Sequence, residues 1–566
     1  MAACPAIFII LVYLFSTCFS LNISLGGSPN IIIFMTDNLS IGDLGIYNNN
    51  SSQTLTPNID RLAEEGVVFS RWYSQSSRIS SIASLLTGLL PPRTGIIKSK
   101  FLSFKEIPSI ASSGGLQHNE TTLAEVLKAK GYATNFVGLW GLGVGKNGEY
   151  LPLGHGFDSW YGVPSAHKDQ CMESYKTTSD SQYTWQAVCS FFSPLLYILP
   201  CVAFIGWYNG LGKIITVFTV IIAFILYSSI LHDVIHFMMD FIQVRSCVLY
   251  RNRSIIEQPY TIENMTLRFT RNAVQFLETS SISSKPFFLF VSYMNLNHPV
   301  FTSRFFLNST TSSYSDALKE VDWSIGRILR TLKERDIDNS TLVLFTSATG
   351  HYFDESCDTC KEEETEDSDE TIFLRGSSKN DICESIIRVP ALMRWKEELA
   401  ERQIIRTPVT VMDVMPTVLE LLNHSTGAFY SDGKSLLPVL FNSSQESQHK
   451  YIFHYIEVTK PAAITSGPYK VVYTEIKDNR GQQSFETPLL FNVETDPEET
   501  SPLPNAEHSE LLANFSEALV DHMKTRRNKW HSQLDSRIIP FWFPCANFPH
   551  CFQVCNENSD FSDLFN

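Results

Sequence analysis

The chain has 566 residues, with 44 Lys and Arg against 59 Asp and Glu, so its net charge at pH 7 is −15. This length allows one large domain with a subdomain, or two to three domains of ordinary size. The acidic balance and the lack of a basic stripe argue against a nucleic-acid-binding protein and favour one that is soluble in a lumen or outside the cell.

The chain begins with a long apolar run, residues 1–20, that ends in small residues and is typical of a signal peptide, although it lacks a basic first segment. Many Asn-x-Ser/Thr sequons follow, and together with a signal peptide they predict a glycoprotein of the secretory pathway. We expect glycans at Asn119, Asn264, Asn308 and Asn339. Asn38 also begins a sequon, but it follows an apolar strand and is expected to stay unmodified.

The N-terminal part of the mature chain, residues 21–185, alternates between strand-like and helix-like segments. Residues 30–36 (NIIIFMT) form a short apolar run of the kind found in buried parallel strands. Residues 57–65 open with a proline and carry charges on one face, which predicts a helix. Residues 134–139 repeat the strand pattern.

Two apolar stretches without charged residues follow at 191–208 and 214–231, joined by NGLGK. Each is near the lower limit for a helix that crosses ~30 Å of hydrocarbon, and we predict a transmembrane helical hairpin over residues 186–240. Two spans would return the chain to its starting side and leave both soluble halves in the lumen. The alternative is a hairpin buried in a soluble core. His232 and His236 are spaced as in some zinc sites, but a helix end at the membrane surface explains them as well.

The cysteine pattern fits an oxidising compartment, where pairing is permitted. Of the 12 cysteines, Cys4 and Cys18 would leave with the signal peptide. Cys171 precedes the predicted hairpin and Cys247 follows it, so we expect a disulfide between these two residues at the membrane-proximal neck.

Residues 241–431 repeat the alternation, with strand patterns at 286–293 and 341–347 and helical patterns at 317–335 and 409–422. Strands that alternate with helices imply an α/β fold with a mainly parallel sheet, which we extend over residues 241–431. In residues 432–566, shorter strand patterns predict an antiparallel subdomain closed by a helix near 509–523. These strand patterns lie at 451–458, 469–476 and 488–493.

Residues 354–370 (DESCDTCKEEETEDSDE) contain few apolar side chains and predict a solvated loop. Cys357 and Cys360 form a weak C-x-x-C motif in this loop. A local disulfide or two free thiols explain the motif better than a redox or metal site, because no further ligands stand at the required spacing.

Sequence blocks along nearly the whole mature chain resemble those of sulfatases. They include TPNIDRLA at 56–63, HGF at 155–157, RVP at 388–390 and LFNVETDP at 490–497. Residues 77–95 (SRISSIASLLTGLLPPRTG) keep the outer frame of the sulfatase pattern C-x-P-S-R-x(3)-x-T-G-R. The chain thus resembles the steroid sulfatase and arylsulfatase group, the branch of the alkaline phosphatase-like superfamily that carries a membrane hairpin. The resemblance implies an alkaline phosphatase-like fold with a mainly parallel central sheet, a C-terminal antiparallel subdomain and an inserted hairpin.

The resemblance also implies a formylglycine nucleophile, a calcium ion, and Lys and His residues that neutralise charge or protonate the leaving group. In this chain Arg78 stands where the cysteine that matures to formylglycine is expected, and Ile82 replaces the arginine that activates it. Ser76 and Ser77 are the nearest alternative nucleophiles. Neither is followed by the Pro and Arg that the pattern requires, so we expect neither to serve.

Of the acidic metal ligands that the resemblance implies, only Asp37 remains, while Asn38, Ala348 and Thr349 stand where other ligands are expected. A site reduced to one carboxylate should bind calcium far more weakly, so we expect no cofactor unless the calcium site survives. As a hypothesis, Arg78 turns its guanidinium toward Asp37 and takes the place of the ion, because an arginine at a helix N-terminus needs a carboxylate partner. The alternative is an ordinary surface arginine.

The Lys and His positions of the family fall on Leu139 and Gly141, and a further His position falls on Asn297, with His298 one step out of register. Lys379 alone matches a family active-site lysine. A surviving cleft that contains this lysine and an arginine at position 78 could hold an anionic small molecule.

These residues favour a membrane-anchored luminal glycoprotein, in the endoplasmic reticulum membrane, that has lost sulfuric ester hydrolase activity and acts in binding or structure. The alternative is an active arylsulfatase or steroid-sulfatase-like hydrolase, which needs a nucleophile that the sequence does not show. Phosphodiesterase chemistry would need Asp and His clusters for two metals, and these are missing.

Overall fold

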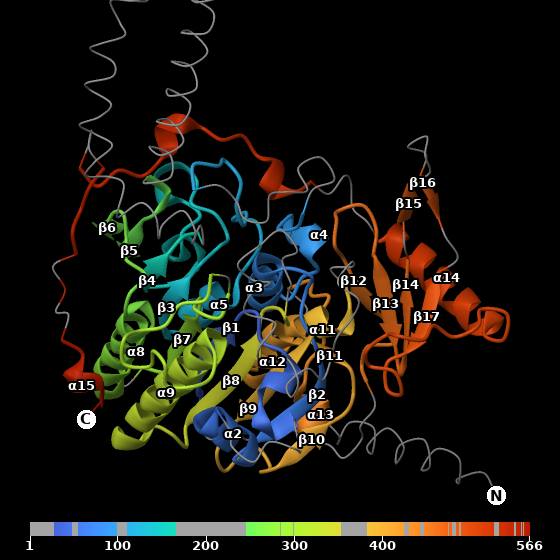
Figure 1. Cartoon of the computed structure of the whole chain (residues 1–566), viewed down its shortest axis with the longest axis horizontal. Coiled ribbons are helices and arrows are strands. Elements are labelled where there is room, and N and C mark those ends of the chain that lie inside the picture. Colours follow the sequence, from blue (N-terminus) through green and yellow to red (C-terminus); the bar gives the residue numbers. More distant parts are fainter. Residues whose placement is uncertain are drawn as a thin grey trace, which may run out of the picture.

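The computed structural model of the chain is shown in Figure 1, where the described residues are coloured. They are 28–47, 55–98, 110–165, 245–283, 285–297, 299–351, 382–423, 429–441, 447–473, 475–477, 483–485, 488–525, 531–547, 551–555, 557 and 560–565. Several predicted features lie outside these ranges: the signal peptide, the hairpin at 186–240, the acidic run with Cys357 and Cys360, and Cys171, His232, His236, His298 and Lys379.

One large sheet forms the centre of the molecule. Its strand order is β10-β2-β9-β8-β1-β7-β3-β4-β5-β6, with β11 beside β2. The bounds are β1 (Asn30–Thr36), β2 (Val67–Tyr73), β3 (Ala133–Leu139), β4 (Ser159–Val163), β5 (Leu249–Arg251), β6 (Ser254–Glu257), β7 (Phe287–Ser292), β8 (Thr341–Ser347), β9 (Arg388–Arg394), β10 (Gln403–Ile405) and β11 (Val409–Thr410). Neighbours from β8 through β1, β7 and β3 to β4 pair in parallel, whereas β9 runs antiparallel to both β2 and β8. The mainly parallel centre that the sequence predicts is therefore present within a mixed sheet.

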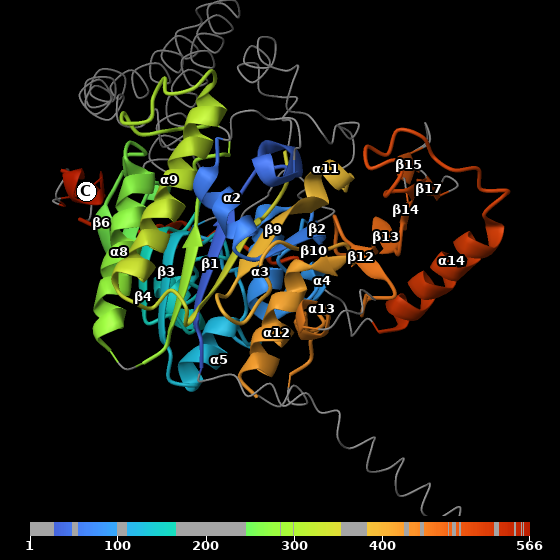
Figure 2. The ribbon, with the colours of Figure 1, turned by 90° about the horizontal axis from the view of Figure 1, so that it is seen from below.

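Helices cover both faces of the sheet, as Figures 1 and 2 show. On one face lie α2 (Pro57–Glu64), α8 (Met265–Ile282) and α9 (Ser313–Glu334), and on the other lie α3 (Arg78–Thr87), α5 (Leu123–Ala129) and α12 (Val414–Leu421). Strand β1 is buried on both faces, with Ile31 and Ile33 in one core and Ile32 and Phe34 in the other. Each such side chain contributes about 1.5–3 kcal/mol by leaving water, which explains the uninterrupted apolar run.

Two helices begin at residues other than those predicted, and local hydrogen bonds explain the difference. The helix predicted from residue 317 begins at Ser313, because the Ser312 side chain accepts a hydrogen bond from the backbone of Ser315 and caps the helix. The helix predicted at 409–422 was too long at its start. Thr410 still belongs to β11, and its backbone N–H donates to Asp413 Oδ2 at 2.8 Å in a capping box, after which α12 begins.

The C-terminal part forms a separate antiparallel sheet, as predicted. Its order is β12-β13-β14-β17, with bounds β12 (Ile452–His454), β13 (Ala463–Ser466), β14 (Tyr469–Val472) and β17 (Leu489–Asn492). Helix α14 (Ser509–Lys524) packs against this sheet through the buried Phe515. The strand predicted at 469–476 is divided into β14 and β15 (Glu475–Lys477), and β15 pairs with β16 (Gln483–Phe485). Short helices complete the chain: α4 (Pro91–Thr94), α11 (Glu384–Ile387), α13 (Leu437–Phe441) and α15 (Ser562–Phe565).

A buried charge cluster joins this second sheet to the main sheet. Lys470 of β14 is fully buried, and its Nζ lies 3.2 Å from Glu384 and 2.8 Å from Glu499. Tyr73 of β2 donates to the other Glu384 oxygen at 3.1 Å. Removing Lys470 would leave two buried carboxylates without their cation, so this residue holds the second sheet against the main sheet.

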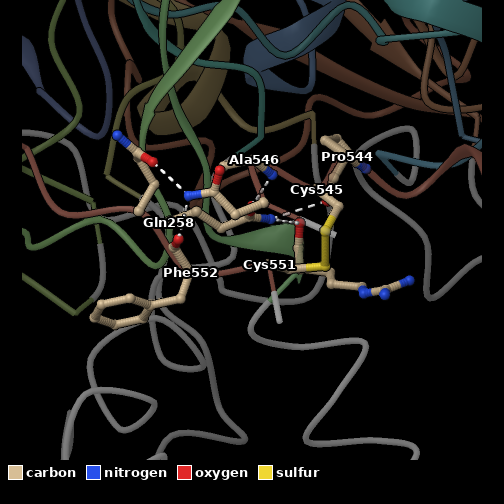
Figure 3. Close-up of a disulfide and its surroundings, with 9 residues drawn as sticks. Gln258, Pro544, Cys545, Ala546, Cys551 and Phe552 are labelled. Atoms are coloured by element: carbon tan, nitrogen blue, oxygen red, sulfur yellow. Dashed lines mark hydrogen bonds between the residues drawn. A yellow bond between two sulfur atoms is a disulfide. The ribbon is translucent and has the colours of Figure 1, made fainter. Parts of the chain in front are cut away.

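The C-terminal tail returns from α14 to the main domain, and α15 packs beside α8 (Figure 1). A disulfide between Cys545 and Cys551 closes a short loop in this tail. Gln258 lies against the loop in Figure 3 and contacts it through both ends of its side-chain amide, to Pro544 O and from Ala546 N, each at 2.9 Å.

Among the residues that the structure describes, no helix is both long enough and apolar enough to cross a membrane. The predicted hairpin lies outside them. Cys247 is disulfide-bonded, but Cys171, its predicted partner, also lies outside the described residues.

Candidate functional site

The candidate site lies at the carboxyl ends of three adjacent parallel strands. Asp37 follows β1, Ser292 ends β7, and Thr349 comes two residues after β8. Open α/β sheets bind ligands at this edge, because successive loops converge there. The first residue of α3, Arg78, completes the group.

Arg78 points into the protein. Its Nη1 lies 2.9 Å from Asp37 Oδ2, and its Nη2 donates to Ser292 Oγ at 2.9 Å and to the carbonyl of Tyr293 at 2.8 Å. The exposed fractions of the two charged side chains are only 9% for Arg78 and 4% for Asp37. The contact expected between Arg78 and Asp37 is present, and the surface-arginine alternative is wrong.

Donors surround the Asp37 carboxylate on every side. Oδ1 accepts from Thr349 Oγ1 at 2.8 Å and from the backbone of Asn38 at 3.1 Å, while Oδ2 accepts from Asn297 Nδ2 at 2.9 Å as well as from Arg78. A carboxylate offers about four lone-pair directions, so these four donors use its accepting capacity.

This arrangement does not fit a calcium ion. Calcium takes six to eight oxygen ligands, several of them carboxylates, whereas here one carboxylate faces a guanidinium, an amide N–H and a hydroxyl that donates. The Asn38 side chain turns the other way, and its Nδ2 donates to the carbonyl of Leu296 at 3.0 Å. Within the described ranges, no three or more His, Cys, Asp or Glu side chains gather as a metal-holding group.

The serines considered as alternative nucleophiles have structural partners. Ser77 is the N-cap of α3, with its Oγ accepting from the backbone of Ser80, and Ser76 Oγ donates to the carbonyl of Tyr455 at 2.7 Å. Ile82, where the sequence pattern leads one to expect the activating arginine, is fully buried in the main hydrophobic core. An arginine at that position would bury a charge where this chain packs an apolar side chain.

The positions of the family's Lys and His are closed by packing. Leu139 is 1% exposed and belongs to the second core. Gly141 has a φ of +78°, and a Cβ placed there would lie 2.9 Å from Ile79 Cγ2, so a histidine would need both a strained backbone and a movement of the Ile79 side chain. Asn297 points to Asp37, whereas His298 and Lys379 lie outside the described residues.

Sequence reasoning missed a second polar group behind Asn38. The Tyr314 hydroxyl lies 3.0 Å from both the carbonyl of Asn38 and Asp43 Oδ2, and His351 Nδ1 lies 3.9 Å from the same Asp43 oxygen. Burial raises the pKa of Asp43, although His351 and the hydrogen bond from Ser40 oppose the rise. In the sequence, Tyr314 and His351 lie far from Asp43, so nothing there indicates that the three side chains meet.

The comparisons with known proteins cover nearly the whole chain. The family model described as Sulfatase matches residues 29–424, and the model for the C-terminal region of aryl-sulfatase matches residues 447–553. Arylsulfatase H of Homo sapiens is 30% identical over 586 residues, which cover 94% of this chain and 98% of that protein. Steryl-sulfatase of Homo sapiens is 31% identical over 529 residues, which cover 88% of each chain.

The fold is shared with solved sulfatase structures. The crystal structure of PsFucS1 sulfatase from Pseudoalteromonas sp. aligns with a TM-score of 0.65 at 20% identity and covers 93% of this chain and 96% of that one. Both family models, the relatives and the shared fold agree with the sequence blocks that frame Arg78. The chain therefore belongs to the sulfatase family.

Proposed function

We propose that this protein is a sulfatase-family glycoprotein that does not hydrolyse sulfate esters and acts instead in binding or structure, anchored in the endoplasmic reticulum membrane with its main domain in the lumen. The observation that carries the proposal is the buried ion pair between Arg78 and Asp37 at the nucleophile position. The proposal also depends on the alignment of residues 77–95 with the family's active-site pattern, which places Arg78 at the nucleophile position.

The chemistry of arginine supports the loss of hydrolysis. A formylglycine attacks through an oxygen of its hydrated aldehyde, whereas a guanidinium is planar, permanently charged and has no nucleophilic lone pair at neutral pH. The Arg78 guanidinium is also held by hydrogen bonds to Asp37, Ser292 and Tyr293. These contacts use the carboxylate that would otherwise hold a metal.

A luminal location is supported by the disulfides and by the exposure of the sequons. Asn119, Asn308 and Asn339 are exposed, and Asn264 is half-buried at the start of α8. The sequon at Asn38 is buried at 3% exposure, in keeping with the expectation that it stays unmodified. Disulfides such as Cys545–Cys551 form in oxidising compartments.

Membrane anchoring is supported by apolar side chains of the C-terminal tail. Phe541 is 96% exposed, and Val554 and Phe552 are about half-exposed. Gln258 donates to the carbonyl of Arg245 at 3.3 Å and also contacts the tail loop. This part of the tail therefore lies near Arg245, which follows shortly after the predicted hairpin. Exposed aromatic side chains beside a membrane anchor are typical of an interfacial surface.

The proposal is tested with the purified full-length protein and an aromatic sulfate ester. We expect no turnover by the unmodified protein and none by Arg78→Cys alone, because Ile82 leaves the pattern incomplete. A rebuilt variant that combines Arg78→Cys, Ser80→Pro, Ile82→Arg, Asn38→Asp, Ala348→Asp and Thr349→Asn is the matched comparison. Turnover by the unmodified protein would overturn the proposal and would favour the alternative of an active arylsulfatase, which the names of the relatives suggest.

A further inference from the structure

A large pocket lies at the opposite end of α3 from Arg78. Its volume is about 660 Å³, within the range of ligand-binding pockets. Thr87, the last residue of α3, lines it, and the helix rise of 1.5 Å per residue places Thr87 about 14 Å along the axis from Arg78. The pocket is therefore separate from the site at the ends of the central strands.

The pocket presents a supported aromatic ring and several polar groups. Tyr430 is 61% exposed, its hydroxyl lies 3.1 Å from Asp432, and the guanidinium of Arg93 lies 4.8 Å from its ring centre. Arg93 is itself held by Asp432, at 2.8 Å, and by Thr525. An aromatic face beside hydroxyl, guanidinium and carboxylate groups suits a sugar, whose C–H face stacks on the ring while its hydroxyls form hydrogen bonds.

The acceptor asparagine of a sequon is part of the pocket wall. Asn119 and Thr121, the first and third residues of this sequon, both line the pocket, and the Asn119 side chain is exposed. A glycan on Asn119 would start at the pocket itself, so its first sugars would be present there at high effective concentration. The sequons at Asn308 and Asn339 are also exposed but contribute nothing to the pocket.

We propose that this pocket holds the proximal N-acetylglucosamine residues of an N-linked glycan on Asn119, an inference that rests on the proposed passage of the chain through the secretory pathway. In the attachment step Asn119 Nδ2 bonds to C1 of the first sugar, the bond from C1 to its lipid pyrophosphate carrier breaks, and the amide loses one proton. The amide keeps its other hydrogen. That hydrogen can still donate to Glu120 Oε1, which Asn119 Nδ2 contacts at 3.0 Å in the unmodified chain.

The test is release of glycans from the native full-length protein by peptide N-glycosidase, followed site by site through the Asn-to-Asp mass change. We expect release from Asn119 to be at least about tenfold slower than from Asn308 and Asn339, because the enzyme must wait for the packed sugars to leave the pocket. All three sites should react at equal rates after denaturation. Tyr430→Ala should bring release from Asn119 up to the rate of the other two sites, while Tyr430→Phe, which keeps the ring, should preserve the slow release.

Two results would overturn the proposal: equal release rates in the native protein, or an unmodified Asn119 in a protein that carries glycans at Asn308 and Asn339. A protein without glycans at any of these sites would instead contradict its proposed passage through the secretory pathway, and the pocket proposal would fail with it. If Tyr430→Ala fails to fold, the comparison of the three sites in the unmodified protein still decides the question.

Discussion

Arg78 and Asp37 form an ion pair in which Nη1 and Oδ2 are 2.9 Å apart and both side chains are more than nine-tenths buried. The pair joins the start of α3 to the end of β1, and Ser292 and Tyr293 extend the contact to the end of β7. Taking two charges out of water costs several kcal/mol per ion, which only a well-formed hydrogen-bonded pair offsets. The carboxyl ends of β1 and β7 are thus joined to the start of α3 by a closed polar contact.

This contact predicts strong coupling between the two residues. Arg78→Met leaves the Asp37 carboxylate buried without its counter-ion and should reduce the free energy of unfolding by about 3–5 kcal/mol. Asp37→Leu should reduce the free energy of unfolding by a similar amount, because it leaves the Arg78 guanidinium buried without its carboxylate. The double variant should lose much less than the sum of the two single losses, which urea unfolding of all four proteins in a double-mutant cycle would measure.

Arg78→Lys is the matched control for this cycle. A lysine keeps the charge opposite Asp37 but lacks the branched guanidinium that reaches both Ser292 and Tyr293. The loss in free energy of unfolding for Arg78→Lys should therefore lie between zero and that for Arg78→Met. Additive losses in the double variant would show that the two side chains do not stabilise each other.

The same geometry predicts that calcium does not change the stability of the unmodified protein. All the donors around Asp37 would have to be displaced before an ion could bind, so millimolar calcium or a chelator should leave the unfolding temperature of the unmodified protein unchanged. The rebuilt variant with restored carboxylates should instead be stabilised as calcium concentration rises. A calcium-dependent increase in the unmodified protein would show that a metal site survives.

The strands were the most predictable part of the fold. The strands predicted at 30–36 and 341–347 match β1 and β8 residue for residue, because strands buried on both faces show uninterrupted apolar runs. Strands β2, β4 and β9 of the main sheet were missed, because polar residues, glycine or proline interrupt their apolar runs. Strand β13 was also missed, since its four residues carry a mixed pattern and pair only within the second sheet. The helix predicted at 409–422 failed at its start, where the capping box of Thr410 overrides the helical periodicity.

The site was predictable only in part. The sequence blocks placed Arg78 opposite Asp37, and a charge argument gave the pair. Ser292 and Tyr293 were not foreseen as partners of Arg78. The Ser292 hydroxyl and the Tyr293 carbonyl come within its reach only because β7 lies next to β1. The position of Lys470 could not be foreseen either, since an isolated lysine in a strand pattern usually faces solvent.

Gln258 should control how firmly the C-terminal tail is held. Its buried side-chain amide contacts Pro544, Ala546 and Arg245, and Gln258→Leu would leave their backbone groups without these partners. A loss of about 2 kcal/mol in local stability should speed limited proteolysis within residues 531–555 by about 30-fold.

Gln553→Ala is the control for this tail prediction. Gln553 contacts Gln258 through backbone hydrogen bonds of 2.8 and 2.9 Å, which the substitution preserves. It removes only the exposed hydrogen bond that Gln553 Oε1 accepts from Asn547 Nδ2 at 2.7 Å. Its tail should therefore be cleaved at nearly the rate of the unmodified protein, as followed by mass spectrometry of the fragments. Equal cleavage of Gln258→Leu and the unmodified protein would mean that the disulfide and the backbone contacts suffice to hold the tail.

The stability of the protein should fall as the pH drops below about 6.5, because His522 is held in its neutral form. Burial, together with the positive charge of the nearby Arg93, lowers the pKa of His522 to about 4. Its ring stacks on Phe453 with centroids 3.7 Å apart, and its Nε2 lies 2.9 Å from the Tyr455 hydroxyl. Between about pH 6.5 and pH 4 the unfolded chain binds a proton at this residue that the folded chain does not. The free energy of unfolding therefore falls as the pH is lowered.

For His522 alone, the expected loss across this window is about 1–2 kcal/mol, after allowance for the part of the ring that solvent reaches. His155, whose pKa burial lowers to about 3, adds a loss of the same sign. His522→Phe keeps the stack on Phe453 but cannot bind a proton, so its urea midpoint should fall less steeply from pH 7 to pH 4 than that of the unmodified protein. The remaining slope should come from residues such as His155, and identical slopes in the two proteins would exclude His522 as a source of the acid sensitivity.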